Sequence, residues 1–242
     1  MKKYGLIGKS LSHSFSKSYF SSFFIENKIN ASYDEFEIAQ IDDVKTLLNS
    51  PINGFNVTIP YKESIIPFLD ELSLEAKEIG AVNTIKIING KTKGYNTDAF
   101  GFHQSIKPFL TNQHEKAIVL GTGGASKAVA YILNNLGIDV FFVSRTPNEI
   151  LNHFSYDDLN NEMINACKLI VNTTPVGMYP DENHLIPIDY GFLTENHLCI
   201  DLIYNPKETL FLKNASQNNA SVLNGNHMLI EQAKESWKIW SK

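Results

Sequence analysis

The stretch KAIVLGTGGASKAVAYILNN, residues 116–135, decides the fold of this chain. Its first part, KAIVL, is a short apolar run typical of a buried β-strand, and the part from about residue 125 has the apolar spacing of an α-helix. A glycine-rich turn, GTGGAS at 121–126, joins the two directly. A strand, a glycine-rich turn and a helix in this order predict a Rossmann-like unit built on a parallel sheet.

The glycine-rich turn predicts a site for a dinucleotide. Glycine at its first and third positions permits a tight turn and lets backbone N–H groups approach a pyrophosphate, which the helix N-terminus also attracts. Ser126 stands where the usual G-x-G-x-x-G pattern has its last glycine, and it is small enough for close helix packing. Many glycine-rich turns are plain loops, but the flanking strand and helix favour a cofactor site here. The cofactor-binding residues expected in the turn are Gly121, Thr122, Gly123, Gly124 and Ala125.

The end of the next predicted strand, DVFFVS at 139–144, favours NADP over NAD. An acidic residue at this place would bind the ribose 2′-hydroxyl of NAD, whereas a cation suits the 2′-phosphate of NADP. The chain has Ser144, Arg145 and Thr146 there. A guanidinium offers a planar set of donors, and the two hydroxyls can add hydrogen bonds. A lone arginine in a loop is usually a surface residue, but its position about 24 residues after Gly121 supports the cofactor interpretation.

Further strands and helices are expected on both sides of this unit. The expected strands are 4–8, 33–38, 55–59, 168–174, 197–204 and about 220–223, and the expected helices are about 17–27, 41–49 and 98–110. The continuous apolar runs of the second half suit a parallel sheet that is buried on both faces. Asn89-Gly90 favours a type I′ hairpin, which makes the sheet of the first half mixed. Trp237 and Trp240 lie on one face of a C-terminal helix that needs a surface to pack on.

The predicted fold class is therefore α/β with two domains. Residues 1–110 form a mixed-sheet domain and residues 111–223 form a Rossmann-like NADP-binding domain. Residues 224–242 form a helix that is expected to pack back on the first domain.

Composition excludes several classes of protein. With 242 residues, of which 43% are hydrophobic and 19% charged, the chain is long enough for two modest domains and too apolar to be disordered. A net charge of −5 without long runs of one sign predicts no binding of nucleic acid or anionic membranes. No run reaches the length of a membrane span or a signal peptide, so a cytoplasmic location is expected. Cys167 and Cys199 are expected to be buried free thiols, and the scattered histidines predict no metal site.

Polar side chains follow the apolar runs of the first half. These residues are Ser14, Ser16, Thr58, Lys62, Asn83 and Asp98. In an open α/β sheet ligands bind beyond the carboxyl ends of the strands, so such residues can meet there. Taken singly, each has an ordinary structural explanation: a helix N-cap for Ser14, Ser16 or Asp98, a solvated charge for Lys62 and a turn residue for Asn83.

The joint order of the motifs is more specific than any one of them. The motifs are SHSFS (12–16), NVTIPYK (56–62), GAVNT (80–84), NTDAFG (96–101), GTGGAS (121–126), SRT (144–146), NTTPVGM (172–178), DLIY (201–204) and GNHMLIEQA (225–233). Together they resemble the shikimate dehydrogenase family from end to end. The resemblance implies a two-domain cytoplasmic oxidoreductase that reduces 3-dehydroshikimate to shikimate with NADPH, and it makes the first domain the substrate-binding, catalytic one.

The resemblance also implies roles for individual residues. Lys62 resembles the catalytic lysine, and Asp98 resembles the carboxylate that orients it and can relay a proton. The substrate-binding residues that the resemblance implies are Ser14, Ser16, Thr58, Lys62, Asn83, Asp98, Tyr204 and Gln232. The further cofactor-binding residues that it implies are Ser144, Arg145, Thr146, Thr173, Leu202 and Gly225. Leu202 replaces the methionine of many members, a change that apolar packing against a nicotinamide tolerates.

Three alternatives share parts of this pattern. They are a quinate/shikimate dehydrogenase that uses NAD, a noncatalytic NADP-binding protein of the same fold, and another reductase such as a methylenetetrahydrofolate dehydrogenase. Arg145 argues against the first, the presence of both Lys62 and Asp98 argues against the second, and the third does not explain Ser14, Ser16 or Asn83. The expected partner is the small-molecule substrate alone, with the protein a monomer or a homodimer.

Overall fold

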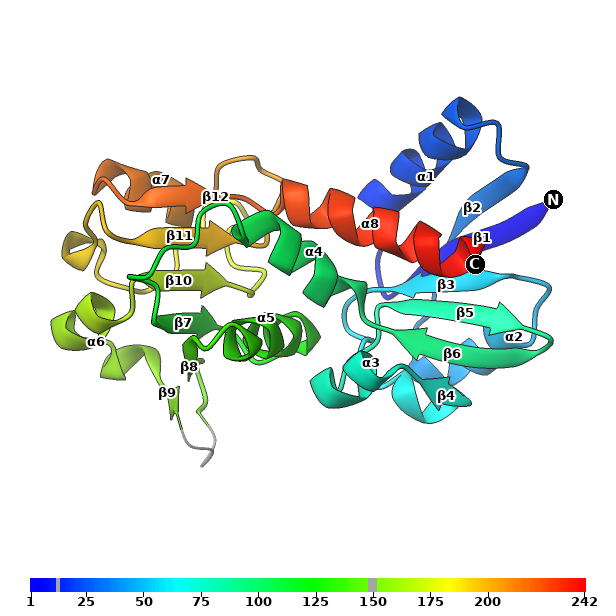
Figure 1. Cartoon of the computed structure of the whole chain (residues 1–242), viewed down its shortest axis with the longest axis horizontal. Helices are drawn as coiled ribbons and strands as arrows, with labels where there is room; N and C mark the ends of the chain where they lie inside the picture. Colours follow the sequence, from blue (N-terminus) through cyan, green and yellow to red (C-terminus); the bar gives the residue numbers. More distant parts are fainter. Residues whose placement is uncertain (12–13, 148–151) are drawn as a thin grey trace. The chain divides into compact units, whose positions relative to one another are not determined.

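The computed structural model of the chain describes residues 1–11, 14–147 and 152–242 (Figure 1). The chain divides into two compact units. Unit 1 comprises Met1–Thr97 together with Ala233–Lys242, and unit 2 comprises Asp98–Gln232. Among the described residues, each unit contains one six-stranded sheet.

The sheet of unit 1 is mixed, in the order β2-β1-β3-β5-β6-β4. Its strands are β1 (Lys2–Gly8), β2 (Ala31–Glu37), β3 (Gly54–Val57), β4 (Glu71–Leu72), β5 (Thr84–Ile88) and β6 (Lys91–Tyr95). β1 pairs in parallel with β2 and β3, while β5 pairs antiparallel with β3 and β6. Asn89 and Gly90, with φ of 51° and 77°, form the turn between β5 and β6. A type I′ turn needs positive φ at both positions, so the predicted hairpin is confirmed.

Both faces of this sheet are covered, because successive side chains of a strand point to opposite faces. On one face, Tyr4 packs with residues of α1 (Phe15–Glu26) and of the last turns of α8 (Asn226–Ser241). On the other face, Ile7 packs with residues of α2 (Val44–Leu48) and α3 (Leu74–Ile79). Two short 3-10 helices, η1 (Ile41–Asp43) and η2 (Ile66–Phe68), border this second face.

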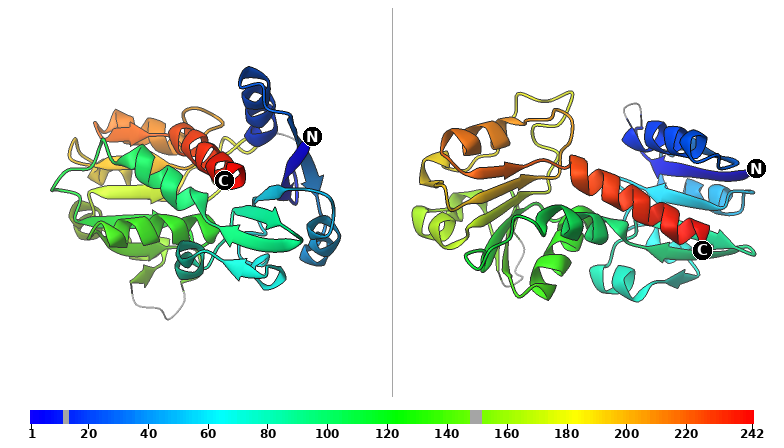
Figure 2. Two further views of the ribbon diagram at one scale, coloured as in Figure 1. Left: turned by 45° about the vertical axis from the view of Figure 1, so that its right-hand side comes forward. Right: turned by 45° about the horizontal axis from the view of Figure 1, so that its top comes forward.

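The end of α8 belongs to unit 1, as the sequence predicts. The Trp240 ring stacks on Tyr4 with 4.6 Å between ring centroids, and Trp237 meets Tyr4 edge-on. The indole N–H of Trp240 donates to the Ile85 carbonyl of β5 at 2.9 Å. Figures 1 and 2 show the red C-terminal turns of α8 alongside β3 and β5.

The sheet of unit 2 is parallel throughout, in the order β12-β11-β10-β7-β8-β9, and runs from top to bottom in Figure 1. Its strands are β7 (Lys116–Leu120), β8 (Asp139–Val143), β9 (His153–Phe154), β10 (Leu169–Asn172), β11 (Leu198–Asp201) and β12 (Ser221–Leu223). The four residues of β10 and the four of β11 are all buried. Central strands without an exposed face explain the continuous apolar runs in the sequence.

Helices lead into the first of these strands or connect one strand to the next. They are α4 (Thr97–Ile106), α5 (Gly124–Asn135), α6 (Asn161–Ala166) and α7 (Leu210–Gln217), with the 3-10 helices η3 (Tyr156–Asp158) and η4 (Tyr190–Phe192). Side-chain caps start two of the α-helices: Asn160 Oδ1 accepts from the Met163 N–H, and Thr209 Oγ1 accepts from the Leu212 N–H. Each cap satisfies a backbone donor that the helix leaves without a partner.

In the described part of the chain, the structure adds two strands and three α-helices to the predicted set: β4, β9, α3, α6 and α7. The two strands have two residues each, and the helices have six to eight, too few for a clear apolar period. The division between the units falls after the first residue of α4 and inside α8, whereas the predicted domains divide near residues 110 and 223. The domain boundaries near residues 110 and 223 therefore stay a prediction.

Two turns of the same type precede β7 and β11. In each, the backbone N–H of a threonine donates to Nδ1 of the histidine three residues later: Thr111 to His114 and Thr194 to His197, both at 3.0 Å. Both histidines are buried, with 8% and 1% exposure. Burial lowers the pKa of each below its usual value, and the neighbouring His197 lowers the pKa of His114 further.

The lowered pKa values predict that acid destabilises unit 2. Below about pH 6.5 the unfolded chain takes up protons at His114 and His197 that the folded chain resists, so the free energy of unfolding decreases as the pH falls from 7 to 5. Urea unfolding across this range measures the slope. In the double variant His114→Asn/His197→Asn, whose Oδ1 can replace Nδ1 as acceptor, the slope is expected to be smaller. An unchanged slope would contradict this assignment.

Candidate active site

Backbone hydrogen bonds hold together the strand ends of unit 1 that carry predicted site residues. Thr58 follows β3, and its N–H donates to the Ile7 carbonyl of β1 at 2.9 Å. The Val82 N–H donates to the Lys62 carbonyl at 2.7 Å, which holds the segment after β3 against the segment before β5. The structure therefore brings the backbone of Thr58, Lys62 and Asn83 to one end of the β3–β5 pair.

Ser14 lies at the N-cap position of α1, yet its side chain makes no capping hydrogen bond. Its Oγ is buried and is the one such side-chain atom without a hydrogen-bond partner in the described part of the chain. A buried polar atom left without a partner costs about 1–3 kcal/mol. The N-cap explanation therefore fails, and the free Oγ supports the prediction that Ser14 binds a ligand. Ser12 and His13 of the same motif lie outside the described residues.

Ser16, in the first turn of α1, is linked to a buried polar network that the sequence interpretation missed. Burial raises the pKa of Tyr33, and a hydrogen bond with the Ser16 side chain partly opposes that rise. The Tyr33 hydroxyl donates to Asn56 Oδ1 at 2.8 Å, and Asn56 Nδ2 donates to Ser236 Oγ at 2.9 Å. The network connects Ser16 to β3 and to α8. Its one signal in the sequence is an asparagine inside an apolar strand.

Asn83 has a larger role than that of a turn residue. It is 3% exposed, its Oδ1 accepts from the Thr97 N–H at 2.7 Å, and its Nδ2 donates to Thr97 Oγ1 at 3.0 Å. Thr97 begins α4, and the next residue is Asp98, which is buried in the first turn of that helix. Asn83 therefore fixes the start of the helix that carries Asp98. The pairing of Lys62 with Asp98 and the substrate contacts of Thr58, Asn83 and Asp98 stay predictions.

The glycine-rich turn of unit 2 has the conformation that a dinucleotide site needs. Gly121 has a φ of 107°, and a Cβ there would lie 2.8 Å from Thr173 Oγ1. Gly123 is the N-cap of α5 and supplies no side-chain cap, and a Cβ there would meet nothing within 4 Å. Open space in front of the N–H groups of a helix N-terminus suits a pyrophosphate. Ser126 Oγ donates to the Gly123 carbonyl, so the serine fits the place of the last glycine.

Arg145 is the second residue after β8 and is exposed, as is Thr146. It is the only arginine of the chain. Burial raises the pKa of Tyr156, and the positive charge of Arg145 opposes that rise, which places the charge near η3. Ser144 Oγ lies 2.8 Å from His153 Nε2 of β9. The Arg145 guanidinium and the Thr146 hydroxyl are both accessible from solvent. The residues at this strand end therefore fit a phosphate group.

The remaining residues that are predicted to bind the cofactor, Thr173, Leu202 and Gly225, follow β10, β11 and β12. Thr173 Oγ1 donates to the Leu120 carbonyl at 2.6 Å, directly beside Gly121. The Leu202 N–H donates to the Asn172 carbonyl at 3.0 Å. Gly225 is required here, because a Cβ on it would overlap the backbone carbonyl of Leu202.

Tyr204 and Gln232, the two predicted substrate-binding residues of unit 2, lie in different segments of the chain. Tyr204 is half-buried in the segment after β11. Gln232 is 8% exposed in α8, and its Nε2 donates to the Leu229 carbonyl at 2.9 Å. Their contacts with a substrate stay predictions.

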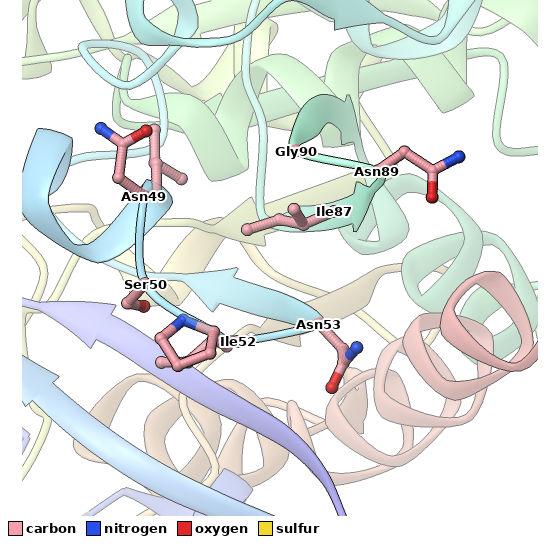
Figure 3. A pocket seen from close by; sticks show the side chains of 9 residues that line it. Asn49, Ser50, Ile52, Asn53, Ile87, Asn89 and Gly90 are labelled. Atoms are coloured by element: carbon pink, nitrogen blue, oxygen red, sulfur yellow. The ribbon is translucent and has the colours of Figure 1, made fainter.

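A hollow of about 380 Å³ lies elsewhere in unit 1 (Figure 3). It is lined by Asn53 before β3 and by Ile87 and Asn89 at the end of β5, so it lies at the opposite end of these strands from Thr58 and Asn83. Asn53 Oδ1 already accepts from the Lys3 N–H at 2.9 Å. The hollow is therefore distinct from the predicted site.

Other features of the described residues limit the chemistry. Cys167 and Cys199 are free and buried, as predicted, and burial raises the pKa values of these thiols to about 11 and about 12. Within residues 1–11, 14–147 and 152–242, no group of three or more histidine, cysteine or acidic side chains is arranged to hold a metal ion. In the same ranges, no helix has the length and apolar character needed to cross a membrane.

A parallel Rossmann-like sheet with an open glycine turn and an arginine after its second strand defines a dinucleotide-dependent oxidoreductase. Residues 6–85 match the family model described as the shikimate dehydrogenase substrate binding domain. The shikimate dehydrogenase (NADP(+)) of Aquifex aeolicus is 40% identical over 98% of this chain and 90% of that protein.

Solved structures agree with this relation. The shikimate 5-dehydrogenase of Thermus thermophilus, in complex with NADP(H) and shikimate, has a TM-score of 0.87 at 30% identity, covering 100% of this chain and 94% of that one. The quinate dehydrogenase of Corynebacterium glutamicum, in complex with NAD, has a TM-score of 0.88 at 29% identity, covering 99% and 93%. The chain belongs to the shikimate dehydrogenase family.

Gly121 and Gly123 of the turn are expected to differ in what they contribute to stability. Gly121→Ala forces a side chain into the left-handed region and against Thr173, so the free energy of unfolding is expected to decrease by about 1–3 kcal/mol. Gly123→Ala is the matched control, because its φ of −82° suits alanine and its Cβ has space. Urea unfolding of both variants measures the difference, and equal losses would contradict it.

Proposed function

We propose that this protein catalyses the reversible NADPH-dependent reduction of 3-dehydroshikimate to shikimate, a step of chorismate and aromatic amino acid biosynthesis. The observation that carries the proposal is the 40% identity to a shikimate dehydrogenase (NADP(+)) over nearly the whole chain. The open glycine turn and the partnerless Ser14 Oγ support it. A cytoplasmic location and a monomeric or homodimeric state, both expected from the sequence, are part of the proposal.

In the proposed reaction, residues of unit 1 bind the substrate. Ser14 and Ser16 donate hydroxyl hydrogen bonds to the substrate carboxylate, and the buried Ser14 Oγ gains the partner that it lacks. Thr58 and Asn83 bind ring hydroxyls from the ends of neighbouring strands. Neutral donors suffice here because hydrogen bonds to a charged acceptor are stronger than neutral ones.

The chemistry of the proposal centres on Lys62. NADPH, when bound, supplies a hydride to the ketone carbon. The Lys62 ammonium stabilises the negative charge that develops on the ketone oxygen and donates a proton to it. Asp98 holds a substrate hydroxyl in place and is assigned the orienting role.

An assay of NADPH oxidation with 3-dehydroshikimate tests the function. Wild-type protein is expected to turn over, and Lys62→Ala is expected to lower kcat by about 10²–10⁴, the usual contribution of a general acid, while it still binds NADPH. Lys93→Ala is the control, because Lys93 belongs to β6 and pairs with Glu71 at 3.3 Å. No turnover by the wild type would refute the function; near-normal turnover by folded Lys62→Ala would refute the role of Lys62.

The quinate dehydrogenase relative, solved with NAD, makes nucleotide choice a separate question. If Arg145 binds the 2′-phosphate, Arg145→Ser removes a charged hydrogen bond worth about 2 kcal/mol, so the KM for NADPH is expected to rise about thirtyfold. The KM for NADH, which lacks this phosphate, serves as the internal control and is expected to change little. A parallel rise for both nucleotides would contradict the assignment of Arg145.

A further inference from the structure

Asp201 is a fully buried carboxyl at the end of β11 that the proposed reaction does not use. Its Oδ1 accepts from Asn172 Nδ2 and from the Ile203 N–H, both at 3.0 Å. Its Oδ2 accepts from Thr209 Oγ1 at 2.6 Å. The carboxyl therefore joins the end of β10, the segment after β11 and the start of α7.

Asn172 connects Asp201 to the loop after β10 through hydrogen bonds. Its Nδ2 is held by Asp201, so its Oδ1 faces the other way and accepts from the Thr174 N–H at 2.9 Å and from Thr174 Oγ1 at 2.7 Å. The amide cannot rotate without the loss of three hydrogen bonds. Asp201 thus fixes which side of Asn172 is presented to Thr174.

The loop held in this way is the wall beside the glycine turn. A Cβ on Gly121 would lie 2.8 Å from Thr173 Oγ1 and 3.0 Å from Thr174 Cγ2, so the turn and the loop are in direct contact. Thr173 is also bound to the Leu120 carbonyl through both its N–H and its Oγ1. A shift of the loop would therefore move the turn that is assigned to the pyrophosphate.

The surroundings of Asp201 favour this arrangement over a simple ion pair. Burial raises the pKa of Asp201 to about 6, and the hydrogen bonds from Thr209, Ile203 and Asn172 oppose the rise. Burial raises the pKa of the nearby Tyr190, and the charges of Cys199 and Asp201 raise it further. The three groups bonded to the carboxyl are all neutral donors. The Asp201 carboxyl therefore acts by fixing the positions of these three donor groups.

We propose that Asp201, acting through Asn172, is a positioning residue that holds Thr173 and Thr174 against the Gly121 turn and thereby sets the affinity of unit 2 for NADPH. The inference rests on the proposed function, because it concerns the nucleotide of that reaction. A purely structural role of Asp201 predicts that its replacement lowers stability alone. The positioning role predicts in addition a loss of NADPH affinity that is not caused by lower stability.

The test measures the Kd of NADPH by its fluorescence on titration of the purified full-length protein, without turnover. Asp201→Ala removes every acceptor and is expected to raise the Kd at least tenfold. Asp201→Asn is expected to stay within threefold of the wild type, because its Oδ1 can still accept from Asn172 and Ile203 and its Nδ2 can donate to Thr209. The KM for 3-dehydroshikimate at saturating NADPH is expected to be unchanged in both.

Cys199→Ala is the control for stability, because Cys199 is equally buried on the same strand and has no part in the link to Asn172. It is expected to lower the melting temperature and leave the Kd unchanged. If Asp201→Ala does not fold, Thr174→Val replaces it; this variant loses the hydroxyl that donates to Asn172 and accepts from the Val176 N–H at 3.3 Å, and it is expected to raise the Kd at least threefold.

Three results would overturn the inference. They are a Kd within threefold of the wild type in folded Asp201→Ala, an equal rise in Asp201→Asn and Asp201→Ala, and an unchanged Kd in Thr174→Val. Failure of the proposed function is distinguishable, because it appears in the wild type: the unmodified protein would then not bind NADPH or not reduce 3-dehydroshikimate.

Discussion

Beyond the carboxyl end of a central strand, backbone N–H and C=O groups no longer have hydrogen-bond partners in the sheet. The need to replace these hydrogen bonds determines how the loops are held in both units. Buried N–H and C=O groups need hydrogen bonds, and loops rarely supply them from their own backbone. The chain meets the need with asparagines. Asn83 binds the first N–H of α4 in unit 1, and Asn172 binds the loop after β10 in unit 2. The same amides that satisfy the backbone therefore position the loops that carry the proposed site.

Much of the fold follows from local sequence, because the decisive signals are short and strong. The glycine turn between an apolar strand and a helix is enough to predict the parallel sheet of unit 2, and Asn89-Gly90 is enough to predict the hairpin of unit 1. The elements that escape prediction depend on tertiary contacts. β9 has two residues and exists only through its pairing with β8. α3 had usable signals in the Ser73 cap and the left-handed Gly80, but its six residues are too few for a period.

The candidate site divides in the same way. Residues within the recognised motifs, such as Lys62 and Gly121, are accessible to sequence reasoning because each motif is contiguous. The hydrogen bonds that hold them in place are not, although Asn56, Asn172 and Asp201 belong to the same motifs. Asn56 and Ser236 are hydrogen-bonded across 180 positions of sequence, and Asn172 and Asp201 across 29. A polar residue in an apolar strand indicates a buried hydrogen bond, but only the fold shows with which partner.

The position of the only arginine has a practical consequence. All other side chains that carry a positive charge at neutral pH are lysines, apart from any protonated histidine. Dicarbonyl reagents that are selective for guanidine groups would therefore label this chain at a single exposed position, two residues after the end of β8. Protection of that position by one nucleotide and not by another would report occupancy of the adenosine end of the site in a protein with its natural sequence.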